Sequence, residues 1–379
     1  MDRDPRTRSD FMAAFERCTI ATPADNDELV ALSRQVAMRA RGMSIAYERG
    51  PDYFAACRES GKDALIGVFK NKDGRVSGTA SLILRDAVCA GERIRYGYFC
   101  DLRTAKLDRK TWLEWLRYYE DTVRFASQVD GVGPLAFHLT TVIDSNERAL
   151  KLLRDRLPGI VYQPLAPYAV GQMFMRLLPR SARVGFGISV RRATLADAPA
   201  LRAFLAAENA LAGIGDAPDE LDRQLAVWPA FTWASFILAT DAGGAIVGCV
   251  APRLGTSKKP VVRDLSLAAR AFAPVTALFG AKRVRDGMPL DVAYACHFHA
   301  RGDQARAVRR ALLVEAFRTS ARGAAHSLCW LEWPGDPATV VDVNDFLHMR
   351  TRGTLYQVTL RGADPISLSA APALDVSTL

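Results

Sequence analysis

The nine residues ATPADNDEL at positions 21–29 return, with five identities at one constant offset, as ATLADAPAL at positions 193–201. Each copy follows a short strand candidate and opens an amphipathic helix, and such repetition indicates a duplicated unit. The repeated aspartates, Asp25 and Asp197, stand at the helix starts, where a carboxylate can accept hydrogen bonds from free backbone N–H groups. We therefore interpret both aspartates as structural caps and the repeat as the beginning of two similar halves.

Both halves continue with the same order of strands and helices, judged from periods of two and of 3.6 residues in the apolar pattern. For the first half, the pattern predicts strands at 18–21, 64–70, 76–85, 93–102, 135–142, 162–165 and 171–177, and long helices at 109–128 and 145–156. For the second half, it predicts strands at 188–192, 236–240, 245–253, 290–298, 327–333 and 353–360, and helices at 304–322 and 337–347.

Three segments lie outside this repeating order. Residues 179–187 are expected to link the halves, residues 255–288 are an insertion, and the small, polar residues 365–379 are expected to fray. Strands that alternate with helices predict an α/β (α+β) layer structure. We expect two domains, residues 1–178 and 188–361, each a mixed, mostly antiparallel sheet flanked by helices.

The composition is that of a soluble, folded protein. The chain has 379 residues, of which 49% are hydrophobic and 24% charged, and this balance excludes a wholly disordered chain. No apolar run is long enough to predict a membrane helix, and the charged N-terminus lacks the apolar core of a signal peptide. We therefore expect a cytoplasmic protein, from a bacterium given its excess of arginine over lysine, that has no membrane partner and exists as a monomer or homodimer.

Charge and cysteine content exclude two further classes. The net charge of +9 is spread over both halves without a basic stripe, so nucleic acid is not an expected partner. The seven cysteines form no CxxC pair, so neither structural zinc nor another metal is expected. A mild positive charge also suits a phosphorylated, anionic ligand.

Three short motifs match one known superfamily. The stretch TTVIDSNERALKLL at 140–153 combines a strand with an Asn-x-x-Ala-x-x-Leu helix that begins at Asn146, YFCDLR at 98–103 ends a strand before a loop, and RRATLAD at 191–197 opens the second half. With the order of elements, these motifs resemble the GCN5-related N-acetyltransferase (GNAT) superfamily in two tandem copies. The resemblance implies acetyl-CoA or another acyl-CoA as co-substrate, and transfer of the acyl group to an amine of a small molecule or protein.

The resemblance also implies a loop that holds the pyrophosphate of the acyl-CoA at a helix N-terminus, where free N–H groups face the anion. The superfamily pattern is Gln or Arg, two residues, Gly, one residue, Gly or Ala. The first half has Arg109 and Lys110 there, but Trp112 and Glu114 replace the two small residues. A tryptophan crowds a phosphate and a carboxylate repels it, so this loop fits the pattern poorly.

The corresponding loop of the second half fits better. Gln304 begins the pattern, Ala307 takes the first small position, and Arg306 and Arg309 add positive charge. This test favours the second half as the acyl-CoA site. The strand and helix at 140–153 are well kept only in the first half, and Asn146 belongs to that motif.

Acyl transfer needs an acceptor for the amine proton, and three residues are candidates. Asp101 ends the strand before the first loop, where the alternative role is a cap. His297 ends the matching strand of the second half, and His299 lies two residues on, but no third ligand accompanies them to form a metal site. Glu332, between two tryptophans, is a third candidate base; the competing interpretation is an exposed strand-end carboxylate.

Two function classes follow. One is an N-acyltransferase whose donor is a CoA or an acyl-carrier-protein thioester. The other is a non-catalytic sensing or protein-interaction module with this fold, in which both cofactor loops have decayed. Trp112 and Glu114 favour the module, and Ala307 with its arginines favours the enzyme.

Overall fold

The described residues of the computed structural model are 15–40, 43–155, 157, 159–177, 187–267, 270–271, 274, 282–322 and 325–378. They form two compact units. The first unit comprises the described parts of Met1–Val36, Glu48–Ala166 and Gly353–Leu368, and the second unit comprises those of Ala37–Tyr47, Pro167–Arg352 and Ser369–Leu379. Of the expected linker at 179–187, all but Gly187 lies outside the described residues.

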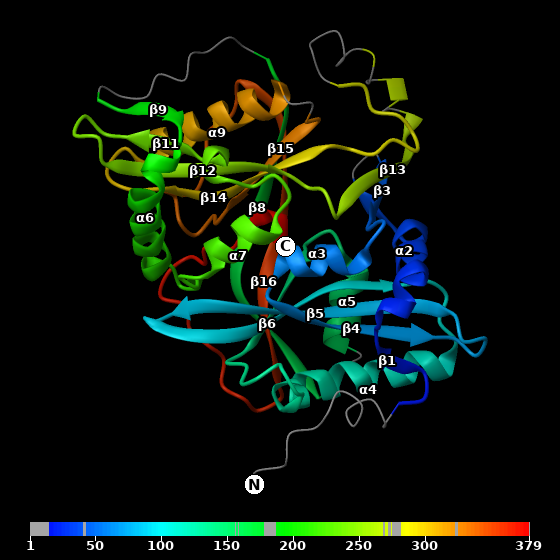
Figure 1. Ribbon diagram of the computed structural model, residues 1–379. Coiled ribbons are helices and arrows are strands. Elements are labelled where there is room, and N and C mark those ends of the chain that lie inside the picture. Colours follow the sequence, from blue (N-terminus) through cyan, green and yellow to red (C-terminus); the bar gives the residue numbers. More distant parts are fainter. Residues whose placement is uncertain are drawn as a thin grey trace. The chain divides into compact units, whose positions relative to one another are not determined.

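The first unit is built on a sheet with one parallel pair (Figure 1). Its strands lie in the order β1 (Cys18–Ile20), β4 (Asp63–Lys70), β5 (Val76–Cys89), β6 (Glu92–Thr104) and β7 (His138–Ile143). All neighbours pair antiparallel except β6 and β7. The helices are α2 (Asn26–Gln35), α3 (Tyr53–Ser60), α4 (Arg109–Phe125) and α5 (Glu147–Asp155).

The second unit repeats this plan. Its strands lie in the order β9 (Ser189–Arg192), β11 (Ile237–Thr240), β12 (Ile246–Leu254), β14 (Val292–Ala300) and β15 (Ser327–Glu332), and only β14 and β15 pair in parallel. Ile237 and Ala239 join the core under α9 (Ala305–Arg322), while Phe236 and Leu238 join the core under α6 (Ala198–Leu211) and α7 (Glu220–Val227). This alternation places helices on both faces of the sheet.

Each unit completes its sheet with a strand from the other half of the sequence. In the first unit, residues 353–358 of β16 (Phe346–Leu360) pair antiparallel with β7. In the second unit, residues 169–173 of β8 (Ile160–Arg176) pair antiparallel with β15. The two short strands expected at 162–165 and 171–177 are therefore one long strand, which continues without a break through Pro164 and Pro167.

The helix expected at 337–347 is wrong. Residues 337–345 contain no helix, and β16 begins at Phe346. The buried residues Val341, Val343 and Asp345 recur every second residue, which is the period of an extended chain and not of a helix. The prediction failed because the apolar residues of this short segment fit both periods.

The insertion and the C-terminal tail both supply ordered parts of the second unit. The insertion supplies β13 (Lys259–Leu265), which forms a small sheet with β3 (Met43–Glu48) and β2 (Ala37–Ala40). The tail does not fray within residues 369–378. Ala371 accepts a backbone hydrogen bond from Gly213, Ala373 donates one to Ile214, and Val376 is buried. Small residues without charge allow this close approach of two backbones.

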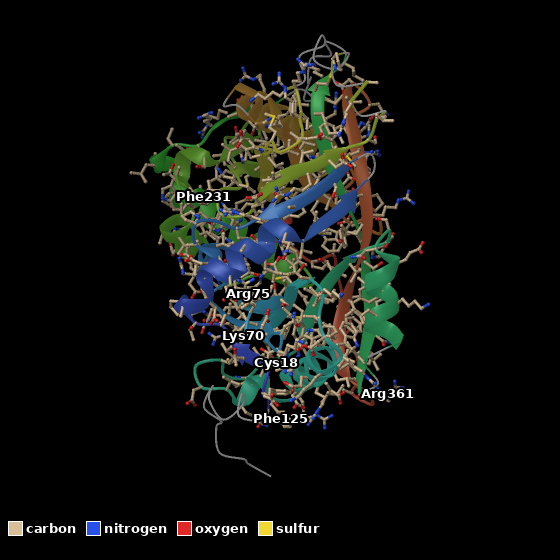
Figure 2. All side chains as sticks on the ribbon, turned by 90° about the vertical axis from the view of Figure 1, so that its right-hand side faces the viewer. Cys18, Lys70, Arg75, Phe125, Phe231 and Arg361 are labelled. Atoms are coloured by element: carbon tan, nitrogen blue, oxygen red, sulfur yellow. The ribbon has the colours of Figure 1, made fainter. Side chains whose placement is uncertain are left out.

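Apolar packing holds α4 against the sheet of the first unit. Trp115, Tyr118 and Tyr119 of α4 enter one core with the sheet, and Cys18, labelled in Figure 2, is fully buried in it.

The mixed, mostly antiparallel sheets flanked by helices confirm the fold class expected from the sequence. Among the described helices, none has the length and apolar character needed to cross a membrane.

The pairing of β8 with β15 leads to a test of the fold. A Cβ atom on Gly171 would overlap the indole of the fully buried Trp330, opposite it in the ladder. We expect Gly171→Ala to lower the free energy of unfolding by about 1–3 kcal/mol, as overpacked cores do. Gly335→Ala, where an added Cβ meets nothing, is the matched control and should change it by less than about 0.5 kcal/mol. Equal denaturation midpoints for both variants would contradict this packing.

Candidate functional site

Strand β14 carries one extra residue at its centre. Its register with β12 moves from Cys249 opposite His299 to Ala251 opposite Cys296, so three steps on β14 face two on β12. The extra residue forms a β-bulge in which His297 has a φ of 47°. A positive φ costs a residue with a side chain about 1–2 kcal/mol, and such strain gathers at functional sites.

The first unit has the same bulge at the same place. The β5–β6 register moves from Thr79 opposite Arg103 to Ser81 opposite Cys100, and Asp101 has a φ of 56°. Two candidate bases chosen from the sequence, Asp101 and His297, are therefore structural counterparts in the two units.

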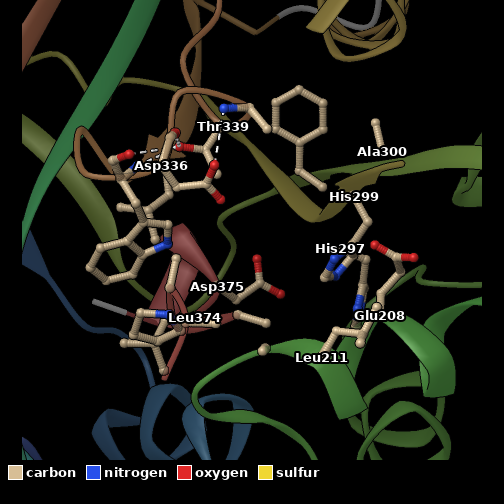
Figure 3. Close-up of a pocket in the computed structure, with 18 of the residues that line it drawn as sticks. Glu208, Leu211, His297, His299, Ala300, Asp336, Thr339, Leu374 and Asp375 are labelled. Carbon is tan, nitrogen blue, oxygen red and sulfur yellow. Dashed lines mark hydrogen bonds between the residues drawn. The ribbon is translucent and has the colours of Figure 1, made fainter. Parts of the chain in front are cut away.

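The pairing of β14 with β15 precedes the bulge. The parallel pairing covers Val292–Tyr294 against Ser327–Cys329, and the bulge follows immediately. A pocket of about 200 Å³ lies along this part of β14 (Figure 3). Its other walls are the end of α6, the loop after β15 and the C-terminal segment 370–375, all of the second unit.

Ionisable side chains line this pocket from separate elements. Four are carboxylates, and they are Glu208, Asp216, Asp336 and Asp375. Arg309, His297 and His299 are the other ionisable residues of its lining. Figure 3 shows His297 and Asp375 facing the same hollow. This excess of carboxylates favours a ligand that carries positive charge, such as a protonated amine.

His297 is buried and held by an uncharged partner. Its Nε2 lies 2.6 Å from Oε1 of Gln224, and its Nδ1 lies 4.0 Å from a carboxylate oxygen of Asp216. The rings of Trp228, Phe231 and Phe236 pack around the imidazole, with centroids 6.1, 6.2 and 5.5 Å away. Burial lowers the pKa of His297, although the Asp375 and Glu220 carboxylates act in the opposite direction. The imidazole is therefore neutral at pH 7.

Arg309 reaches into the pocket from α9. Its Nη1 donates to the carbonyl of Phe298 at 2.7 Å, and its guanidinium lies 3.9 Å from the centroid of that ring. Burial lowers the pKa of Arg309 to about 10, which leaves it charged. Burial also raises the pKa of Glu208 and lowers that of His299 to about 3.

The first turn of α9 faces solvent. Gln304, Arg306 and Ala307 are all exposed, and Gly302, with a φ of 82°, turns the chain into the helix. The helix is 18 residues long, so its first N–H groups and its dipole present a positive end. Three of the residues expected from the sequence thus lie together at the helix start, while Arg309 lies apart from them in the pocket.

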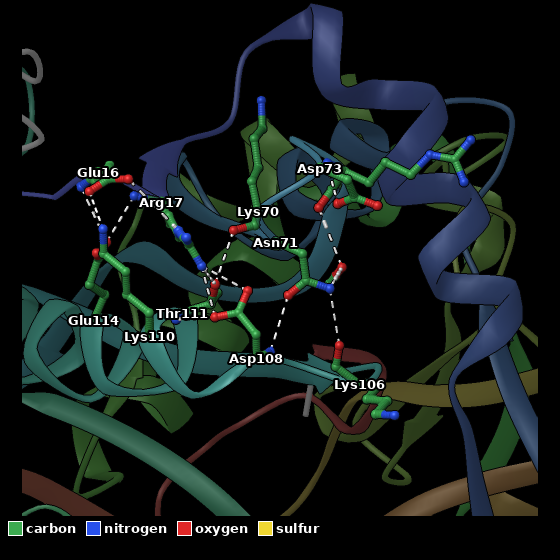
Figure 4. Close-up of polar contacts among 12 residues, drawn as sticks. Glu16, Arg17, Lys70, Asn71, Asp73, Lys106, Asp108, Lys110, Thr111 and Glu114 are labelled. Atoms are coloured by element: carbon green, nitrogen blue, oxygen red, sulfur yellow. Dashed lines mark hydrogen bonds and ion pairs between the residues drawn. The ribbon is translucent and has the colours of Figure 1, made fainter.

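The first turn of α4, its counterpart in the first unit, is occupied by side chains of the protein (Figure 4). The Asp108 carboxylate caps the helix by accepting from the Thr111 N–H at 3.0 Å and also pairs with Arg17. Glu114 accepts hydrogen bonds from the backbone N–H groups of residues 16 and 17. Carboxylates therefore already occupy the place where a phosphate would bind. Lys110 forms an ion pair with Glu16, and Arg109 is exposed beside it.

The remaining predicted residues of the first unit have structural partners. Asp101 is buried between Arg49 and Arg103, with both of which it forms ion pairs, and Tyr53 donates to it at 3.4 Å. Asn146 caps α5, since its Oδ1 accepts from the Ala149 N–H at 3.2 Å. Both side chains therefore have structural roles.

Glu332 is not an exposed strand-end carboxylate, as the competing interpretation had it, because only 2% of its surface is accessible. Its two oxygens accept from the Trp330 indole at 2.8 Å, from the Val341 N–H at 3.0 Å and from Arg350 at 2.8 and 3.2 Å. These bonds fasten the loop 333–345 to β15, and that loop forms one wall of the pocket. The side chain acts as a structural anchor.

Several residues of the site were missed from the sequence, three that line the pocket and one that contacts His297. Glu208 and Asp216 lie near the end of α6, Gln224 lies on α7, and Asp375 lies in the tail that was expected to fray. None belongs to a motif, and they are far apart along the chain. Only the folding of α6, α7 and the tail onto β14 brings them together.

Solved structures with the same fold span nearly the whole chain. A GCN5-related N-acetyltransferase from Sphaerobacter thermophilus is 16% identical, with a TM-score of 0.52 over 93% of this chain and 98% of that one. An N-myristoyltransferase of Saccharomyces cerevisiae with bound myristoyl-CoA and inhibitors is 12% identical, with a TM-score of 0.58 over 98% and 87%. A glucosamine N-acetyltransferase region of a fungal β-N-acetylglucosaminidase is 12% identical, with a TM-score of 0.55 over 90% of this chain and 38% of that one.

No protein-family profile matches the sequence, and no curated protein matches it either. Identities this low show the fold alone. The resemblance predicted from the motifs is thereby confirmed at that level, and the chain has the GCN5-related N-acetyltransferase fold.

Proposed function

We propose that this protein is an N-acyltransferase that uses acetyl-CoA or another acyl-CoA and that its working site is the pocket of the second unit. The observation that carries the proposal is the bulge at His297, which brings a buried imidazole and the edge of β14 to a pocket that Arg309 of α9 also lines. The acceptor is an amine of a small molecule or of a protein. The carboxylates of the lining suit the ammonium form in which such an amine arrives.

The reaction is direct attack on the thioester. The ammonium first loses one proton to solvent, and the neutral amine nitrogen then forms a bond to the acyl carbon. The carbon–sulfur bond breaks, CoA leaves as the thiolate and takes up a proton from solvent, and the nitrogen loses a second proton. A backbone N–H on the open edge of β14 would stabilise the oxyanion. His297 accepts the proton lost by the amine, for which it must be neutral, as burial makes it. No covalent enzyme intermediate is needed.

The first turn of α9 would hold the pyrophosphate of the acyl-CoA. Ala307 leaves room for the phosphates, Gln304 and Arg306 supply donors, and free N–H groups complete the site. Arg309 lies deeper, against the Phe298 carbonyl, and we assign it to the thioester end of the donor. A thioester on an acyl-carrier protein would use the same end of the site.

In this proposal the first unit supports the second and does not bind a second acyl-CoA. Asp108 and Glu114 occupy the start of α4, which leaves Arg109 and Lys110 without a phosphate site to complete. Asp101, at the bulge, is neutralised by two guanidinium groups. We also propose that the units arose by duplication, which the matching bulges and the sequence repeat support.

One observation favours the second candidate function, a non-catalytic binding module. Arg309 occupies the second small position of the loop pattern, and its guanidinium uses the Phe298 carbonyl on the open edge of β14. If that contact persists with acyl-CoA present, the edge is not available to the donor. Titration of the protein with acetyl-CoA and with a long-chain acyl-CoA separates the two functions, because the module reading predicts no binding of either.

The pyrophosphate assignment is tested by comparing exposed arginines at the starts of α9 and α4. We expect Arg306→Ala to weaken acyl-CoA binding about tenfold, the effect of about 1.4 kcal/mol, because it removes an exposed charge beside the phosphates. Arg109→Ala, on the first turn of α4, is the matched variant and should leave the affinity unchanged. Isothermal titration calorimetry gives both constants. Loss of affinity in the Arg109 variant alone would place the site in the first unit.

The role of His297 is tested by its pH dependence. Because the neutral imidazole is the active form and burial lowers its pKa, kcat/KM should stay level as the pH falls through 6.5 and decrease only at lower pH. His297→Asn should reduce kcat by on the order of 10²–10⁴-fold and abolish this acidic limb. His326→Asn, in the same unit but outside the pocket lining, is the control. Full activity of the His297 variant would refute the assignment.

A further inference from the structure

Gln224 lies behind His297 on the side away from Asp216. It projects from α7, is 3% exposed, and its Oε1 lies 2.6 Å from Nε2 of the imidazole. A glutamine amide has one accepting and one donating end, so the orientation of the amide decides which proton the imidazole carries. The orientation follows from what the other end of the amide contacts.

Glu220 determines that orientation. It lies one helical turn before Gln224, and its Oε1 accepts a hydrogen bond from Nε2 of Gln224 at 3.0 Å. A carboxylate can only accept, so the NH₂ group must face Glu220 and the carbonyl oxygen must face His297. Arg223 holds the Glu220 carboxylate with two hydrogen bonds of 2.8 and 2.5 Å. The direction of the whole chain of bonds is therefore fixed from the surface of α7 inwards.

We propose that Gln224 is a positioning residue that holds His297 in the Nε2–H tautomer and thereby leaves Nδ1 as the proton acceptor of the acyl transfer. With its proton on Nε2 and directed at the Gln224 carbonyl, the imidazole has its lone pair on Nδ1. That nitrogen lies on the side of Asp216, which lines the pocket. The inference rests on the proposed function for the use of Nδ1, but the tautomer itself does not depend on any activity.

An uncharged partner also matters for the strength of the base. A carboxylate in the place of Gln224 would favour the imidazolium and raise the pKa of His297. The ionisable groups that face this imidazole come from several elements, and they are the carboxylates Asp216, Asp375 and Glu220, and the neutral His299 with the charged Arg309 beyond it. The amide adds no charge to this set, so the imidazole stays neutral and can accept a proton at pH 7.

The tautomer can be read directly from the ¹⁵N chemical shifts of the imidazoles in the intact protein. The chain has five histidines, and the signals absent from His297→Asn identify the pair that belongs to His297. We expect wild-type His297 to show a protonated Nε2 and an unprotonated Nδ1. Gln224→Leu should mix the two tautomers, and Gln224→Glu should keep the tautomer but raise the pH at which the ring titrates by about one unit or more. A protonated Nδ1 in the wild type, or an unchanged tautomer in Gln224→Leu, would overturn the proposal.

Activity provides the second readout. Gln224→Leu should lower kcat on the order of 10²-fold with little change in KM for the acyl-CoA, and Gln224→Glu should restore kcat while moving the acidic limb of the pH profile to higher pH. If the acidic limb of the pH profile of Gln224→Glu stays at the wild-type pH, the result counts against the positioning role of Gln224. If no acyl transfer is found but the tautomer is as expected, the proposed function fails and the positioning by Gln224 stands.

A variant at the partly buried Glu220 covers the case in which a change at the fully buried Gln224 prevents folding. Glu220→Ala removes the acceptor that orients the amide, so the tautomers of His297 should again mix. Asp222→Ala removes a carboxylate from the same helix, where it pairs with Arg202 at the surface, and is the matched control. If the imidazole ¹⁵N shifts of His297 are the same in Glu220→Ala and Asp222→Ala as in the wild type, Glu220 does not orient the Gln224 amide.

Discussion

One extra residue in β14 underlies the arrangement of the candidate site. A regular strand alternates its side chains between the two faces of the sheet, so an inserted residue re-aims the side chains around it and increases the local twist. In β14 the inserted residue is His297, whose positive φ is held by the antiparallel ladder with β12 on both sides of the bulge. The ordered pairing with β15 covers only the residues before it. The placement of the histidine at the pocket follows from this irregularity, and the other walls come from α6, the loop after β15 and the C-terminal segment.

The two units show how the same backbone feature can take opposite chemical roles. At the bulge of β6, Asp101 is surrounded by Arg49 and Arg103, so its charge is compensated and its oxygens are occupied. At the bulge of β14, the corresponding side chain is a neutral imidazole with an amide behind it. Burying a charge requires a partner of opposite charge, whereas burying a neutral histidine requires only hydrogen bonds. The first arrangement stabilises its unit, and the second leaves a nitrogen that can accept a proton.

The helix starts differ in the same way. A helix N-terminus with free N–H groups attracts an anion. At α4 the protein supplies that anion itself, as the carboxylate of the Asp108 cap, which pairs with Arg17. At α9, Gln304, Arg306 and Ala307 are exposed, and the first turn includes no acidic side chain. Trp112 and Glu114, which depart from the superfamily's loop pattern, therefore have structural roles in this protein. Trp112 packs against the core of the first unit, and Glu114 binds the chain entering β1.

The sequence by itself determined the order of most strands and helices, the fold class and the two related halves, because apolar periodicity and helix caps are local properties of the chain. It also singled out Asp101 and His297 as counterparts, since each lies at the end of a strand predicted from the sequence, although the strands β6 and β14 continue beyond them. It could not show which strand β8 and β16 would pair with, because an alternating pattern fits any sheet edge. It gave no sign that Glu332 is buried or that the tail lines a pocket. Burial, the partners of each ionisable group and the tautomer of His297 are set by contacts between residues distant in the chain, and only the tertiary structure decides those.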